Sequence, residues 1–487
     1  MPSPFSHRGI VEGFYGRPFA HEDRLWWISE LARLDMNRYV VAPKTDPLHR
    51  ERWRERYAAD DLALSAELVH RGAAKGVLIG FGVSPGLSIA ASSAPDVAAL
   101  LAKFRDFYDA GSRFLILALD DVPSALSSRD RHAFSSLAAA HVALAHAVAD
   151  AFPDATLWFV PNDYTGCGAT DYLDELGEGL APKIEVAWTG RSTLAPTIPR
   201  SEAAGRAASL RRRLLLWDNV PVADGPMRNL LHMGCYAGRD PRLSEHVSGI
   251  LLNPMQHARS SWLMVACAAA YLADPSAYSP EAAWQESARI LGAGSPDAFA
   301  LWANAHRFSP MTPEAGDSEL EAAFQAALSA GSHEDELAIH VAELRELLAR
   351  RRRLAETLRS GLTDRRLLGE IEPWIAGHHE ETRRMDAGIQ ALECLLDPST
   401  DDMGRCTAVS VFEGSLTLHP PATPVSYGPR RAFYPQMISH RERGAGFGED
   451  PALYTDRNLA DAVVSFASDT CLRLSGARRA YDPGASA

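Results

Sequence analysis

The sequence has few of the features that mark secreted or metal-binding chains. Its 487 residues include only six cysteines, which are scattered, with no Cys-x-x-Cys pair and no metal-ligand spacing. The N-terminal stretch lacks a basic segment followed by an apolar run, so it does not resemble a signal peptide. We therefore expect a soluble, reduced, cytoplasmic protein without a metal or cofactor. A chain from which a signal had been removed would look the same.

A net positive charge and long apolar runs are also lacking. The formal net charge of −13 argues against a nucleic-acid or anionic-membrane partner. The most membrane-like stretch, Trp262–Ala273, is too short to span a bilayer and predicts a core helix instead. No GxGxxG motif follows the first apolar run, which argues against a dinucleotide-binding sheet.

The first half of the chain does contain a regular alternation of short apolar runs and amphipathic helical patterns. The runs are continuously apolar, as is typical of strands buried on both faces of a parallel sheet. There are eight of them: Gly9–Val11, Arg38–Val41, Gly76–Phe81, Phe114–Leu119, Thr156–Val160, Ile184–Ala187, Leu214–Leu216 and Gly249–Leu252. Eight βα units within about 280 residues predict an α/β fold of the (β/α)8 TIM-barrel type. An open doubly wound sheet is the alternative, but it would not need eight similar units.

The composition changes after about residue 275, where Ala, Leu, Glu and Arg recur with helical spacing. We predict a catalytic barrel over residues 1–278 and an α-helical bundle over residues 279–400. Residues 401–487 are predicted to form a small region of mixed structure packed on the bundle. Within the bundle, His378 and His379 are interpreted as a surface pair rather than a metal site.

Polar and aromatic residues gather where the apolar runs end. In a barrel all eight carboxyl ends of the strands lie on one rim, where the active sites of this fold are built. Any one of these residues could belong to a turn, but the set predicts a concave pocket. Its members are Glu12, Lys44, Asp120, Asp121, Asp163, Tyr164, Trp188, Trp217, Asp218, Asn219 and Asn253.

Asp120 and Asp121 stand directly after the run FLILAL. Most glycosidases place two acids on opposite sides of the scissile bond, which adjacent residues cannot easily do. Adjacent acids suit the substrate-assisted variant, in which the 2-acetamido oxygen of the sugar attacks the anomeric carbon. One ionised carboxylate then polarises the acetamido N–H, and a second, protonated acid serves the leaving oxygen. The alternative is that Asp121 caps a helix opening at Val122-Pro123.

Six segments, each at a strand end and in the same order, resemble glycoside hydrolase family 84. They are GIVEGFYGRPF (Gly9–Phe19), MNRYVVAPKTDPLHRERWRERY (Met36–Tyr57), LALDDV (Leu117–Val122), WTG (Trp188–Gly190), LLWDNVPVADG (Leu215–Gly225) and GILLNP (Gly249–Pro254). This family comprises β-N-acetylglucosaminidases, including the protein O-GlcNAcases, and the likeness covers roughly residues 5–275. It implies a retaining exo-β-N-acetylglucosaminidase that removes terminal β-linked GlcNAc by substrate-assisted catalysis through an oxazoline intermediate.

The resemblance also implies roles for individual residues. Asp120 would orient the acetamido group, and Asp121 would act first as general acid and then as general base. The remaining residues would hold the sugar: Tyr164 near the acetamido oxygen and anomeric centre, Trp217 around the acetamido methyl, Asn219, Asp224 and Asn253 on ring hydroxyls, and Lys44 with the Gly13 carbonyl on the 3-hydroxyl. A buried sugar needs its hydroxyls paired, which agrees with this polar set.

The chain departs from the family pattern around Asp224, where Ala223 and Gly225 replace larger residues and leave the aglycone preference open. The implied substrate is a β-GlcNAc-bearing glycoprotein, glycopeptide or small glycoside, and a homodimer stays open. A catalytically idle glycan-binding protein is the main alternative, although an idle relative would be expected to lose one acid of the pair. An unrelated hexosaminidase would usually pair Asp with Glu, and an interaction protein would use residues 280–487.

Overall fold

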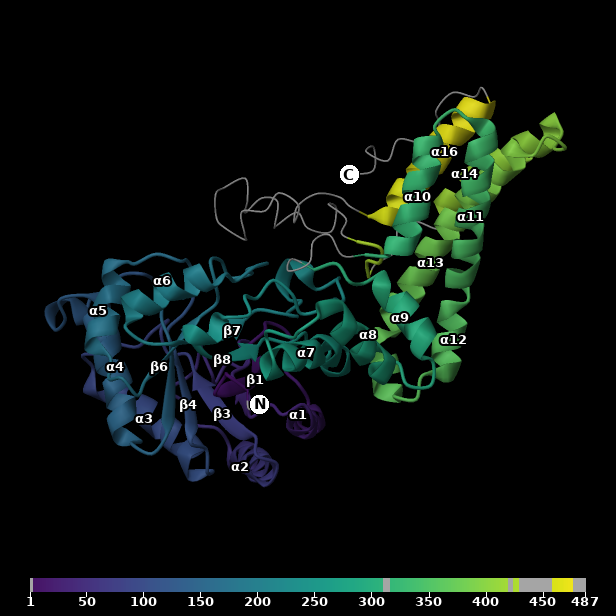
Figure 1. Ribbon diagram of the computed structural model, residues 1–487. Coiled ribbons are helices and arrows are strands. Elements are labelled where there is room, and N and C mark those ends of the chain that lie inside the picture. Colours follow the sequence, from purple (N-terminus) through teal and green to yellow (C-terminus); the bar gives the residue numbers. More distant parts are fainter. Residues whose placement is uncertain (1–2, 310–315, 419–423, 429–457, 476–487) are drawn as a thin grey trace. The chain divides into compact units, whose positions relative to one another are not determined.

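The first part of the chain folds as a closed barrel of eight parallel strands in sequence order (Figure 1). The computed structural model describes residues 3–309, 316–418, 424–428 and 458–475. The strands are β1 (His7–Glu12), β2 (Arg38–Val41), β3 (Leu78–Val83), β4 (Phe114–Ala118), β5 (Thr156–Val160), β6 (Glu185–Trp188), β7 (Leu214–Asp218) and β8 (Val247–Leu252). The predicted TIM barrel is confirmed, and the alternative of an open sheet is wrong.

Each strand is followed by helical or loop segments that return the chain to the start of the next strand. The helices of this part are α1 (His21–Arg33), α2 (Ala59–Ala74), α3 (Ala94–Asp109), α4 (Leu137–Ala151), α5 (Asp171–Gly179), α6 (Arg200–Leu210) and α7 (Ala258–Ala273). Ser93, Ser136 and Thr170 begin three of them, because their side-chain oxygens accept hydrogen bonds from backbone N–H groups of the first turn. Nearly all of α7 is buried, as expected for a core helix.

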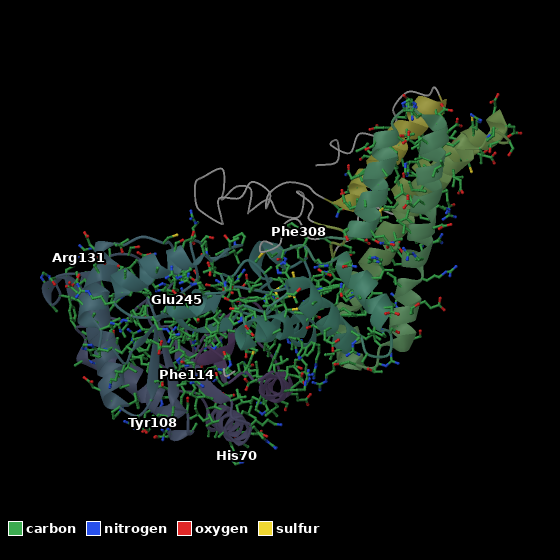
Figure 2. All side chains as sticks on the ribbon, in the orientation of Figure 1. His70, Tyr108, Phe114, Arg131, Glu245 and Phe308 are labelled. Atoms are coloured by element: carbon green, nitrogen blue, oxygen red, sulfur yellow. The ribbon has the colours of Figure 1, made fainter. Side chains whose placement is uncertain are left out.

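Aromatic side chains fill the barrel interior. Phe114, labelled in Figure 2, stacks on Trp158 with ring centroids 6.3 Å apart, and Trp158 lies 5.5 Å from Trp217. Tyr164 packs partly against this cluster. Because side chains occupy the interior, the barrel is a packed core and the chemistry belongs to the strand ends. Trp217 connects the two, since its ring belongs to the core while its indole N–H reaches the end of β7.

The described residues form two compact units. One holds residues 3–225 and 236–283, and the other holds residues 226–235 and the described residues from Trp284 onward. The helices that begin at or beyond residue 280 are α8 (Pro280–Leu291), α9 (Pro296–Asn304), α10 (Ser318–Ala330), α11 (Glu334–Arg352), α12 (Leu354–Gly361), α13 (Arg365–Leu396), α14 (Asp402–Leu418) and α16 (Leu459–Ser475). The predicted boundaries at 278 and 400 stay predictions, and much of residues 401–487 lies outside the described residues.

Residues 226–235 belong to the second unit although they precede β8 in the sequence. The Asn229 carbonyl accepts a hydrogen bond from the Trp374 indole N–H at 3.2 Å. The Met233 carbonyl accepts a hydrogen bond from the Trp284 indole N–H at 2.6 Å. The Met233 N–H donates to the His306 carbonyl at 2.9 Å. The backbone of this segment is therefore paired with residues that lie far along the chain.

The helical unit has an apolar core with polar groups inside it. His378 is buried, with its Nε2 atom 2.7 Å from the Tyr427 hydroxyl, so the prediction of a surface pair is wrong for this residue. The ring stacks on Tyr427, and burial lowers the pKa of the imidazole. Within the described ranges, no cluster of three or more His, Cys, Asp or Glu side chains is arranged to hold a metal ion. No described helix is long and apolar enough to cross a membrane.

Candidate active site

Asp120 follows β4 and forms a buried ion pair with Lys44, which follows β2. The Lys44 ammonium donates to Asp120 Oδ2 at 2.5 Å, and both side chains are less than one-tenth exposed. Burial by itself would raise the pKa of Asp120, but the Lys44 charge and the more distant Arg50 outweigh it and hold that pKa below its usual value. The second oxygen, Oδ1, is buried and has no hydrogen-bond partner among the described residues. Asp120 is thus an ionised carboxylate with one oxygen able to accept a further donor.

Asp121 is exposed and its backbone is left-handed, with φ of 52°. This conformation is uncommon for a residue other than glycine. Arg50 supports it, because its guanidinium donates to the Asp121 carbonyl at 2.9 Å and to Ser84 Oγ at 3.1 Å. The next helical turn begins only at Asp130, so the alternative that Asp121 caps a helix is wrong. The two adjacent carboxylates therefore have different surroundings, one buried and one open to solvent.

Two tyrosines bind the Asp121 carboxylate, one on each oxygen. Tyr164 donates to Oδ1 at 2.8 Å, and Tyr15 donates to Oδ2 at 3.3 Å. Burial and the nearby Asp121 charge raise the pKa of Tyr15 to about 12 and raise that of Tyr164 further, so both phenols stay protonated donors. The sequence-based set included Tyr164 but missed Tyr15. Its only signal was its place in EGFYG at the end of β1.

Tyr15 also reaches Asp224 through its backbone. The Tyr15 N–H donates to Asp224 Oδ2 at 2.7 Å. Asp224 is half-buried, and burial raises the pKa of its carboxyl. The loop after β1 therefore joins two acids that come from the loops after β4 and β7.

Two asparagines, a tryptophan and a glycine form a second group beside the ion pair. Asn219 Oδ1 accepts from the Trp217 indole and from the Asn253 amide, each at 2.9 Å. Asn253 Oδ1 in turn accepts from the Gly13 N–H at 3.3 Å. A Cβ on Gly13 would lie 2.2 Å from the Trp217 ring, so only glycine fits there. The Lys44 ammonium lies 5.7 Å from the centre of the same ring and connects the two groups.

The structure thus brings all nine predicted site residues into two neighbouring groups. Other strand-end residues that were expected around the mouth of the pocket have partners outside these two groups. Glu12 is fully buried and binds Arg24 and Tyr39. Asp218 is paired with Arg239 and Tyr236, and the Trp188 indole donates to the Gly166 carbonyl. Glu12, Asp218 and Trp188 therefore have structural partners in the folded barrel, and a role of any of them in the pocket stays untested.

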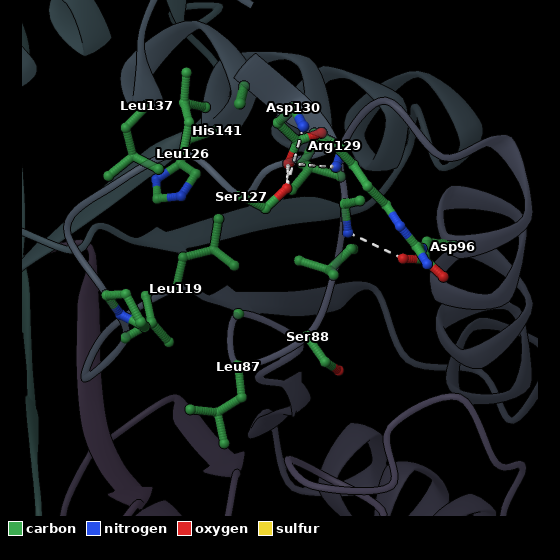
Figure 3. A pocket seen from close by; sticks show the side chains of 18 of the residues that line it. Leu87, Ser88, Asp96, Leu119, Leu126, Ser127, Arg129, Asp130, Leu137 and His141 are labelled. Atoms are coloured by element: carbon green, nitrogen blue, oxygen red, sulfur yellow. Dashed lines mark hydrogen bonds between the residues drawn. The ribbon is translucent and has the colours of Figure 1, made fainter. Parts of the chain in front are cut away.

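A cavity of about 750 Å³ lies next to the pair (Figure 3). Leu119 and Val122, which flank the two acids in sequence, contribute to its lining together with His141 of α4. Asp130 fixes the far end of the loop, because its carboxylate accepts from the N–H groups of Ala91 and Ser92. The loop that carries Asp121 is therefore anchored at both ends but lies over open space.

A parallel (β/α)8 barrel with adjacent acids, stacking tryptophan and amide side chains at its strand ends defines a glycoside hydrolase. The chain belongs to the beta-N-acetylglucosaminidase family, whose model matches residues 8–304. This confirms the family that the sequence motifs resemble.

Named relatives agree with this assignment. The chain is 32% identical over 253 residues to the protein O-GlcNAcases of Rattus norvegicus and Mus musculus. That match covers 50% of this chain but only 28% of each relative, so the chain spans a minor part of their length. A mutant of the Thermobaculum terrenum O-GlcNAc hydrolase has a similar structure, with a TM-score of 0.80 and 27% identity over 99% of both chains.

Proposed function

We propose that this protein is a retaining exo-β-N-acetylglucosaminidase that uses the acetamido group of its substrate as the nucleophile. The observation that carries the proposal is the state of Asp120. Its carboxylate is ionised, fixed by Lys44 through one oxygen and buried without a partner at the other. A buried acceptor without a donor is costly, and the N–H of a 2-acetamido group would satisfy it.

The roles of the two acids follow from this placement. The acetamido N–H donates to Asp120, which directs the acetamido carbonyl oxygen at the anomeric carbon. As that C–O bond forms, the glycosidic C–O bond breaks and the leaving oxygen takes a proton from Asp121. A water molecule then opens the oxazoline, with Asp121 accepting its proton, and two displacements at one carbon retain its configuration.

The remaining groups suit a single terminal sugar. Trp217 offers an aromatic wall beside Asp120, and Asn219 and Asn253 offer amides for ring hydroxyls. Asp224 supplies a half-buried carboxylate for the 4- and 6-hydroxyls. In contrast to the resemblance-based expectation, Lys44 is engaged with Asp120, so its contact with the 3-hydroxyl would use a second ammonium hydrogen.

The names of the relatives support a substrate bearing O-linked GlcNAc. We extend this to a glycoprotein, glycopeptide or small glycoside with a terminal β-GlcNAc. Turnover of a glycopeptide compared with a chito-oligosaccharide would separate protein-linked sugar from cell-wall fragments.

The test uses glycosides with good and poor leaving groups. Asp120→Asn should depress turnover of an aryl and a methyl β-N-acetylglucosaminide alike. Asp121→Asn should depress turnover of the methyl glycoside far more than turnover of the aryl glycoside, because only a poor leaving group needs protonation. A wild-type protein that binds both glycosides and cleaves neither would instead be an idle glycan-binding protein. Equal cleavage of the 2-amino substrate, which lacks the acetyl group, would exclude substrate assistance.

A further inference from the structure

Each oxygen of the Asp121 carboxylate accepts a hydrogen bond from a tyrosine in this structure. Tyr164 donates to Oδ1 at 2.8 Å and Tyr15 donates to Oδ2 at 3.3 Å. A general acid must direct one protonated oxygen at the leaving oxygen, so the phenol bound to that oxygen can compete with the leaving oxygen for it. The structure identifies which of the two it is.

Tyr164 is the better fixed of the pair. Its hydrogen bond is the shorter one, its ring packs partly against the barrel core, and its carbonyl accepts from the Thr189 N–H at 3.1 Å. The Tyr15 side chain is 45% exposed and its hydrogen bond is long. The phenol of Tyr15 can therefore leave Asp121 by rotating toward solvent, whereas that of Tyr164 is held by its surroundings.

The backbone of Tyr15 is anchored separately from its side chain. Its N–H donates to Asp224 Oδ2 at 2.7 Å, and the carbonyl of the following Gly16 accepts from the Thr45 hydroxyl at 2.5 Å. These contacts keep the loop after β1 in place while the ring moves. The charged groups that act on the phenol are Asp121, Arg50 and Asp120, and the raised pKa of Tyr15 leaves it a neutral donor.

We infer that Tyr15 is a positioning residue. Its phenol binds Asp121 Oδ2 at the place that the glycosidic oxygen must occupy. This inference rests on the proposed function. In the productive complex the phenol turns away and Oδ2 carries the proton. That proton passes to the glycosidic oxygen as the bond from C1 to that oxygen breaks and the acetamido oxygen bonds to C1. Every glycoside therefore binds in competition with Tyr15, whereas a sugar without an oxygen at C1 does not.

The test compares two ligands that differ only in the methoxy group at C1, which contains that oxygen. Methyl β-N-acetylglucosaminide has it, and 2-acetamido-1,5-anhydro-2-deoxyglucitol lacks it. Tyr15→Phe keeps the ring and removes the competing hydroxyl. We expect it to raise kcat/KM for the methyl glycoside about 2- to 12-fold, the equilibrium equivalent of one hydrogen bond, and to leave the inhibition constant of the anhydro sugar unchanged. An unchanged or lower kcat/KM, or an equal effect on both ligands, would overturn the inference.

Two further measurements keep the result decisive. Tyr15→Leu removes the hydroxyl with a different side chain and should shift kcat/KM in the same direction if Tyr15→Phe does not fold. Tyr164→Phe is the matched control at the other oxygen and should lower turnover. If the wild-type protein cleaves no glycoside, the proposed function fails, and calorimetry in an Asp120→Asn background then decides the inference. Adding Tyr15→Phe there should tighten binding of the methyl glycoside alone, and equal or absent tightening would contradict it.

Discussion

At the scale of single residues, Lys44 decides the charge of Asp120. The carboxyl is buried, which alone would favour its neutral form, and the adjacent ammonium, assisted by Arg50, reverses this preference. The proposed reaction needs Asp120 ionised, so Lys44 acts on the chemistry through Asp120 as well as through any contact with the sugar.

Replacing Lys44 should therefore change the pH dependence of turnover. In Lys44→Met, burial is no longer opposed, the pKa of Asp120 rises, and the carboxylate protonates at higher pH. We expect the acidic limb of kcat/KM to move to higher pH, in addition to any loss in rate. The measurement is a pH–rate profile on an aryl β-N-acetylglucosaminide. Lys44→Arg keeps the charge and should keep the limb near its wild-type position, and an unmoved limb in Lys44→Met would refute the idea.

The residue scale also shows where sequence-based prediction stops. Glu12, Asp120 and Asp218 all follow or end apolar strands, and their position at a strand end alone gives no reason to separate them. Arg24 and Arg239 pair with Glu12 and Asp218, whereas Asp120 keeps one oxygen without a partner. Such pairing depends on side-chain directions in the folded barrel. For the same reason Tyr15, which meets Asp121 from 106 positions away, could not be predicted.

At the scale of elements, the strands were predictable because they are buried on both faces. The eight apolar runs coincide with the eight strands, with ends that differ by a few residues. The left-handed Asp121 was not predictable, because the Arg50 contact that stabilises it comes from the loop after β2.

The contact between the ends of β1 and β7 gives a prediction at this scale. In Gly13→Ala the new methyl group would meet the Trp217 ring at 2.2 Å, so the ring must move. We expect a loss of about 1–3 kcal/mol in the free energy of unfolding, together with a higher KM. Thermal denaturation and steady-state kinetics measure both. Gly168→Ala is the matched control, because nothing lies within 4 Å of its Cβ position, and equal behaviour of the two variants would contradict the packing argument.

Helices α10 and α11 share a buried ion pair that gives a second prediction. Arg351 is fully buried and donates to both oxygens of Asp317, each at 2.6 Å. Asp317 is also the N-cap residue of α10. Arg351→Met leaves a buried carboxylate without its cation and should cost about 3–5 kcal/mol in urea unfolding. Arg350 pairs with Glu319 at the surface, so Arg350→Met should cost less than about 1 kcal/mol. Similar losses in both variants would show that burial does not decide the difference.

At the scale of the whole molecule, residues 226–235 begin two positions after Asp224 and belong to the helical unit. A chain ending at residue 283 would lose Trp284, His306 and Trp374, which pair with the backbone of this segment. We expect such a chain to lose stability and to raise the KM for aryl glycosides through the adjacent Asp224 loop. A chain ending at residue 428 keeps all three partners and should retain more activity. Equal activity of the two truncated chains would disprove the link.

The same segment constrains how this protein can be recombined. A terminal module can be gained, lost or exchanged at one junction. Here, however, the helical unit includes residues 226–235, ten residues that lie between β7 and β8 in the sequence. A chimera that takes the helical unit of a relative must therefore take residues 226–235 with it, which requires three junctions in place of one. Barrel and helices are for this reason expected to be inherited together, and a graft at a single site would carry mismatched backbone partners into the loop that follows Asp224.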